Sequence, residues 1–134
     1  MKNKRFKYYQ PNDKDLKDEY GYCVVRSLTK ALNKDWFSVY DDLVVIAREL
    51  QAMPNTKISY EQYLKQNGFE YTGISNRKGT KRPTVESFTK ENHDGVYVMV
   101  VANHLVTCVD GIYYDTFDSG FKSMYGYWNK EVRI

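Results

Sequence analysis

Hydrophobic residues in the first part of the chain recur at helical spacing. Apolar side chains return every three or four residues over Tyr22–Leu32, and "NKDW" ends that pattern. The same period resumes from Phe37 to about Gln51, where "MPNTK" breaks it. Two amphipathic helices are therefore expected, each with one apolar stripe directed at a core.

Two shorter helices are expected downstream. Ser59 is a candidate N-cap for a helix that runs to Leu64, because Gln62 follows it at capping-box spacing. A loop that contains glycine and lysine then leads from about Asn67 to Pro83. Thr84 is the candidate cap of a fourth helix, "VESFTKEN".

After Gly95 the sequence is typical of β-strands. The segments "VYVMVVA", "HLVTCV" and "IYYDTF" are rich in valine and tyrosine and lack helical spacing. The first is apolar on both faces, which predicts a central strand. Asp110–Gly111 lies between the other two, and Asp-Gly in that position strongly predicts a hairpin. The segment "MYGYWNKEVRI" predicts one more strand, with a kink at Gly126.

Helices followed by strands predict an α+β domain, with N-terminal helices packed on a C-terminal antiparallel β-sheet. The 134 residues suit one domain, 1–134, with a core of its own. Residues 1–19 are polar and are expected to form an arm that leads to the first helix.

Charge and hydropathy exclude several function classes. The net charge is only +3 and the basic residues are dispersed, so no nucleic-acid partner is expected. The densest basic segment, Asn76–Arg82, is interpreted as a solvated loop. No apolar run approaches the roughly 18 residues of a membrane span, so no membrane partner is expected. The start of the chain has no secretory pattern, which favours a cytoplasmic location.

The hairpin brings a histidine and a carboxylate together. A two-residue turn at Asp110–Gly111 places His104 opposite Phe117. Because side chains alternate faces along a strand, Asp115 falls on the His104 face, diagonally across the pair. Asp118 falls on the other face if the ladder stays regular, although a bulge would reverse the preference.

Cys23 lies where a helix is expected to begin. The helix dipole and the free amides of the first turn stabilise a thiolate there, and a neighbouring histidine brings the pKa values of such thiols to roughly 3.5–7.5. The backbone N–H of such a cysteine is also a natural oxyanion donor. Considered alone, Cys23 is equally compatible with a small buried side chain.

These motifs resemble a known family. "CVVRSL" at a helix start, followed by helices and then "NHLVTCVDGIYYDTFD", resembles the small papain-like cysteine peptidases of bacteriophages and their hosts. More broadly, the order is similar to bacteriocin-processing and NlpC-type cysteine peptidases. The resemblance implies a papain-like fold with Cys23 as nucleophile, His104 as general base and Asp115 as the residue that orients it.

The resemblance also implies a function without a cofactor. The expected activity is thiol-dependent hydrolysis of a peptide or isopeptide amide in the cytoplasm of a bacterium or phage-infected host. The alternative is a catalytically silent papain-like domain that binds a host protein. Enzymes of this kind carry a side-chain amide before the cysteine to complete the oxyanion hole, and the nearest here are Gln10 and Asn12.

The remaining candidates favour structural roles. Cys108 is interpreted as a core residue, and His93 as a surface residue at a helix end. A zinc site is not expected, because the cysteines and histidines include no closely spaced pair. The aromatic residues of the strands are interpreted as sheet packing. A base-stacking platform on them is the alternative, and it would need a contiguous basic face beside it.

Overall fold

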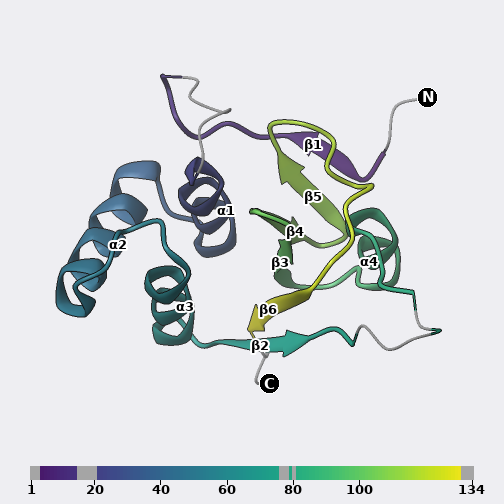
Figure 1. The fold of residues 1–134 in the computed structure, drawn as a ribbon. Coiled ribbons are helices and arrows are strands. Elements are labelled where there is room, and N and C mark those ends of the chain that lie inside the picture. The colour runs from purple at the N-terminus through teal and green to yellow at the C-terminus, as the bar shows by residue number, and fades with distance from the viewer. Residues whose placement is uncertain (1–3, 15–20, 76–78, 80, 131–134) are drawn as a thin grey trace.

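The computed structural model describes residues 4–14, 21–75, 79 and 81–130 (Figure 1). It contains four helices and a six-stranded sheet, which confirms the predicted α+β class. In chain order the elements are β1 (Phe6–Tyr8), α1 (Tyr22–Leu32), α2 (Trp36–Leu50), α3 (Lys57–Gln66), β2 (Phe69–Gly73), α4 (Val85–Glu91), β3 (Val96–Val101), β4 (His104–Val109), β5 (Ile112–Asp115) and β6 (Gly126–Lys130).

The sheet has the order β1-β5-β4-β3-β6-β2. Strand β3 lies between β4 and β6, so the prediction that it is a central strand is confirmed. The β4–β5 hairpin pairs Val109 with Ile112. Its turn residues, Asp110 and Gly111, have φ values of 49° and 83°, the left-handed conformation that a two-residue hairpin turn requires.

Two strands were not anticipated. The N-terminal arm contributes β1, which runs parallel to β5, so the sheet is mixed rather than wholly antiparallel. Strand β2 lies inside the predicted loop and pairs with β6 at the sheet edge. Both strands are short, and four of the five β2 residues are exposed, so neither shows the hydrophobic alternation of a buried strand.

Helices α1 and α2 closely follow their predicted ranges, but α3 begins earlier. Its N-cap is Thr56, and the prediction that Ser59 caps this helix is wrong. The Ser59 hydroxyl donates instead to the Met53 carbonyl, and its side chain is fully buried. The Thr84 cap of α4 is confirmed, and its capping box is completed by Ser87.

Helices α1–α3 lie on one side of the sheet and α4 lies on the other (Figure 1). A hydrophobic core lies on each of the two faces. Neighbouring residues of β3 belong to different cores, because side chains alternate across a strand: Val98 packs with α1–α3, and Met99 packs with α4. The first core carries α1 against β4, the strand that begins with His104. This packing fixes the position of α1 relative to the candidate histidine.

Parts of several predictions lie outside the described residues. These parts are 15–20 of the N-terminal arm, 76–78 and 80 of the basic loop, and 131–134 of the last strand segment. Among the helices that the structure describes, none combines the length and the apolar composition needed to cross a bilayer.

Candidate active site

Cys23 is the second residue of α1 and is 9% exposed. The helix is preceded by Gly21, whose φ of 93° is a left-handed conformation suited to glycine. A Cβ atom at Gly21 would lie 2.2 Å from Nδ2 of Asn55, so only a residue without a side chain allows this approach. The chain therefore enters α1 in one tight geometry, and that geometry positions the thiol.

His104 begins β4 directly after the turn from β3. Its backbone pairs with Val101, and Asn103 completes the turn with a φ of 52°. Two buried hydrogen bonds connect α1 to this strand: the Ser27 hydroxyl donates to the Leu105 carbonyl at 2.8 Å, and the Thr107 hydroxyl donates to the Ser27 carbonyl at 2.7 Å. Since Leu105 follows His104, these bonds fix the helix that carries Cys23 against the strand that carries the imidazole.

The imidazole of His104 connects Cys23 with Asp115. Its Nε2 donates to Oδ2 of Asp115 at 2.7 Å, and its side chain is 11% exposed. Because Nε2 is engaged in that bond, Nδ1 is the nitrogen left for the thiol. Burial acts to lower the pKa of His104, but hydrogen bonds to Asp115 and Cys23, together with their charges, raise it from 6.5 to about 9. The ring is therefore protonated on both nitrogens at neutral pH, as an imidazolium cation.

Asp115 is held by four donors and its side chain is 1% exposed. Oδ2 accepts from His104 and, at 2.6 Å, from the Ser119 hydroxyl. Oδ1 accepts from the Thr116 amide at 2.8 Å and lies 3.4 Å from Nη2 of Arg26. A carboxylate with both oxygens engaged can hold the imidazole in one orientation.

The choice between Asp115 and Asp118 is resolved at the level of contacts. His104 bonds Asp115, as the hairpin register predicts. Asp118 accepts instead from the Tyr113 hydroxyl and from the Gly120 amide. The predicted partner Phe117 lies against the His104 ring, with ring centroids 5.2 Å apart. The ladder itself is paired from Val109–Ile112 to Thr107–Tyr114, and the side chains beyond it still meet as the Asp-Gly turn predicts.

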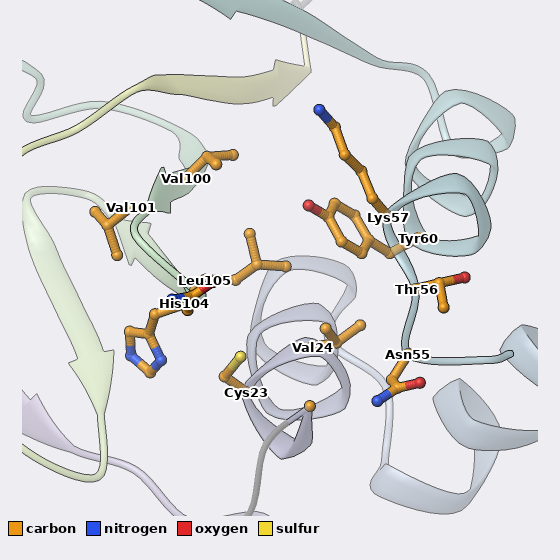
Figure 2. Close-up of a pocket in the computed structure, with 12 residues that line it drawn as sticks. Cys23, Val24, Asn55, Thr56, Lys57, Tyr60, Val100, Val101, His104 and Leu105 are labelled. Carbon is orange, nitrogen blue, oxygen red and sulfur yellow. The ribbon is translucent and has the colours of Figure 1, made fainter.

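Cys23 and His104 line one cleft of about 360 Å³ (Figure 2). Its walls come from the start of α1, the start of α3 and the turn between β3 and β4. Tyr60, Val100 and Leu105 supply apolar surface, whereas Lys57 supplies a positive charge. The complete lining is Gly21, Cys23, Val24, Asn55, Thr56, Lys57, Tyr60, Val100, Val101, Asn103, His104 and Leu105.

The side-chain amides of this cleft are not those expected from the sequence. Among its described lining residues the amides belong to Asn55 and Asn103, and neither Gln10 nor Asn12 lines it. Gln10 follows Tyr9, whose backbone amide donates to the Asp115 carbonyl. Its Oε1 accepts from the backbone amide of Asn12 at 3.1 Å.

Three residues at the site were missed in the sequence. Arg26 and Ser119 contact Asp115, and Asn55 lines the cleft beside Gly21. Arg26 could have been predicted to lie near the site, because a residue three positions after Cys23 shares its helix face. Asn55 and Ser119 lie in irregular segments, where periodicity gives no orientation.

The other candidate residues lie away from this chemistry. Cys108 is fully buried in the second core, and burial raises the pKa of its thiol to about 11. His93 is exposed beyond the end of α4. Within the described part of the chain, no group of three or more Cys, His, Asp or Glu residues is arranged to hold a metal ion.

The strand aromatics for which base stacking was the alternative mostly serve as packing; they are Tyr113, Tyr114, Tyr125, Tyr127 and Trp128. Tyr113 and Trp128 are almost fully buried in the two cores, and Tyr127 packs against Phe88 of α4. Tyr125 is exposed and lies under the Arg82 guanidinium. One exposed ring of this set does not form a platform for successive bases.

A thiol at a helix start, a protonated imidazole and a buried carboxylate can perform nucleophilic chemistry on an acyl group. Searches of protein-family models, curated proteins and solved structures found no match to this chain. The geometry of the site is therefore the basis on which a function can be assigned.

Proposed function

We propose that this protein is a thiol-dependent amide hydrolase of the papain-like class, acting on a peptide or isopeptide bond. Cys23 is the nucleophile, His104 is the general acid and base, and Asp115 orients the imidazole. The observation that carries the proposal is the position of His104. Its Nε2 bonds Asp115 at 2.7 Å, and interactions with Asp115 and Cys23 raise the pKa of its ring. It also lines, together with Cys23, a cleft where a substrate carbonyl has room to approach.

The protonated state of His104 supports this assignment. An imidazolium beside a thiol favours the thiolate, which is the nucleophilic form of cysteine. In acylation the sulfur attacks the substrate carbonyl carbon, and the C–N bond then breaks as the Nδ1 proton passes to the leaving amine. Neutral His104 next removes a proton from water, which attacks the thioester. The C–S bond breaks, and the acid product and the thiolate are released.

Two kinds of donor are available for the oxyanion. The backbone amide of Cys23 belongs to the first turn of α1, where amides have no partner within the helix. The side-chain amide of Asn55 lines the same cleft and packs against Gly21. Removal of one such donor costs an enzyme about a hundred-fold or more in kcat. In this proposal Asn55 supplies the second oxyanion donor, the role that a glutamine upstream of the cysteine would otherwise have.

A binding role without catalysis is the second candidate, and the outer face of α2 favours it. Phe37, Tyr40 and Val44 recur at a spacing of three or four residues and are exposed, and the neighbouring Val45 is 59% exposed. Such a surface could contact a host protein whether or not Cys23 reacts.

Covalent labelling tests the proposal. The protein is incubated at pH 7 with a panel of peptidyl vinyl sulfones and analysed by intact-mass spectrometry and peptide mapping. One adduct is expected, on Cys23, and none on Cys108. A positive probe sequence is then converted to a peptide amide, whose cleavage should stop in Cys23→Ala.

His104→Ala is the matched control, because it keeps both thiols and removes the proton donor. Labelling should be lost or strongly slowed in this variant. If no probe labels the wild type, or if His104→Ala labels equally fast, the hydrolase proposal fails and the binding role takes its place.

A further inference from the structure

The buried side chain of Arg26 is not explained by the three residues of the proposed hydrolase. Arg26 lies on α1, three residues after Cys23, and is 4% exposed. Residues three apart on a helix share a face. The helix that presents the thiol therefore brings a guanidinium to the same buried cluster.

Arg26 and His104 contact different oxygens of one carboxylate. Nη2 of Arg26 lies 3.4 Å from Oδ1 of Asp115, whereas Nε2 of His104 lies 2.7 Å from Oδ2. The Thr116 amide supports the first oxygen and the Ser119 hydroxyl supports the second. Rotation of the carboxylate would break contacts on both sides, so Arg26 and His104 hold it in one plane.

Packing alone does not account for an arginine here. A buried guanidinium loses its hydration, and an apolar side chain of similar length often packs with no loss of stability. The Nη1 atom of Arg26 is buried and has no hydrogen-bond partner among the described residues. The single ionic partner of this side chain in the described chain is Asp115. Its charge therefore acts on that carboxylate.

The charges around His104 determine what effect Arg26 is expected to have. Asp115 of β5 and Cys23 of α1 contact the imidazole, and Lys57 of α3 lines the same cleft. On β3 the titratable side chain is Tyr97, which pairs with Cys108 at the other end of β4. Lys57 is exposed, so solvent screens its charge. In the buried cluster, the charges of the Cys23 thiolate, the His104 imidazolium, the Asp115 carboxylate and the Arg26 guanidinium sum to zero. Without Arg26 the cluster would carry a net negative charge, and His104 would bind its proton more tightly.

We infer that Arg26 is a positioning residue of this site. It fixes the Asp115 carboxylate in place and partly neutralises its negative charge. Arg26 thereby sets how tightly His104 holds the proton that acylation must transfer. The inference deepens the proposed function and rests on it for its catalytic meaning. An acid that holds its proton too tightly transfers it slowly, so the balance matters for turnover.

The test is the titration of His104 itself. The Cε1–H signal is followed by ¹H–¹³C NMR in the wild type, Arg26→Met, Arg26→Gln and Arg26→Lys, with His93→Ala used for assignment. Loss of the charge in Arg26→Met and Arg26→Gln should raise the midpoint by about one pH unit. Arg26→Lys keeps a charge and should shift the midpoint by less than half as much.

A second pair of variants tests whether Arg26 acts through the carboxylate. In an Asp115→Asn background, Arg26→Gln should move the midpoint by less than half of its shift in the wild type. Arg26→Gln keeps polar donors near Asp115, so it provides the measurement if Arg26→Met fails to fold.

An unchanged or lowered midpoint in folded Arg26→Gln would overturn the inference, and so would an equal shift with and without Asp115. The titration needs no substrate. A failed labelling experiment would thus refute the hydrolase proposal while leaving the coupling of Arg26 to His104 measurable. A normal labelling result with an unmoved titration would refute the role of Arg26 alone.

Discussion

Oδ2 of Asp115 lies 2.7 Å from Nε2 of His104, across a hairpin whose turn is Asp110–Gly111. Through this contact, the register of the two strands determines the protonation of His104. The turn type fixes which residues pair, and the pairing places the carboxylate on the histidine side. The raised pKa of His104 depends on that placement.

Exchange of the carboxylate for an amide should lower the pKa of His104. In Asp115→Asn the ring loses its anionic partner, and the NMR titration midpoint should fall by about 1–3 units. Asp118→Asn is the matched control, since that residue bonds Tyr113 and Gly120 instead. A fall of equal size in Asp118→Asn would show that the assignment of the orienting residue is wrong.

Stability should depend on the protonation of His104. The folded-state pKa is about 9, above the ordinary 6.5, so the protonated ring stabilises the fold fully below about pH 6.5. That contribution disappears as pH rises through 9. The free energy of unfolding of wild type minus His104→Ala should therefore shrink by at most about 3 kcal/mol between pH 6 and pH 10.

Urea denaturation at several pH values measures this difference, with His93→Ala as the exposed control. The difference for His104→Ala should be largest at pH 6. A difference that stays constant, or that grows as pH rises, would contradict the raised pKa.

The glycine before α1 should be required for the site and not only for the turn. Gly21→Ala places a Cβ against the Asn55 side chain, at a φ of 93°. Gly79→Ala has a similar φ of 90° and no atom within 4 Å, so it isolates the backbone cost of roughly 1–2 kcal/mol. Gly21→Ala should lose more stability than Gly79→Ala and should also slow Cys23 labelling. Equal losses and unchanged labelling would mean that the Asn55 contact is unimportant.

The two cysteines should differ sharply in accessibility. Cys108 is fully buried, with a pKa raised to about 11, whereas Cys23 lines an open cleft. Titration with a chromogenic disulfide at pH 7.5 should give one reactive thiol in native protein and two in guanidinium. Cys108→Ser should retain the native signal, and Cys23→Ser should lose it. Native reactivity that survives in Cys23→Ser would contradict the burial of Cys108.

The sequence was informative in several places where a short-range rule applied, although the capping-box spacing at Ser59 misplaced the start of α3. Apolar spacing located α1 and α2, and the Asp-Gly turn predicted the contact between His104 and Asp115 from parity alone. Cys23 could be placed at a helix start because Gly21 lies two residues before it and a helical pattern follows. These features depend on neighbours in the chain, so they can be predicted without a tertiary structure.

The features that were missed depend on tertiary contacts. Strand β1 forms because the arm returns to β5, and β2 forms because β6 offers an edge. Asn55 reaches the cleft through the loop before α3, and Ser119 reaches Asp115 through the loop after β5. No local pattern encodes where two loops meet. The oxyanion donor was sought upstream of Cys23 for the same reason, whereas the amide that packs against Gly21 follows α2.

The most direct test of the central claim is the pH dependence of Cys23 alkylation. The rate with iodoacetamide is measured from pH 4 to pH 9 in a Cys108→Ser background, with and without His104→Ala. The proposed thiolate–imidazolium pair predicts rapid alkylation below pH 7 that His104→Ala abolishes. A thiol that reacts only above about pH 8 in both proteins, as an ordinary cysteine does, would contradict the account.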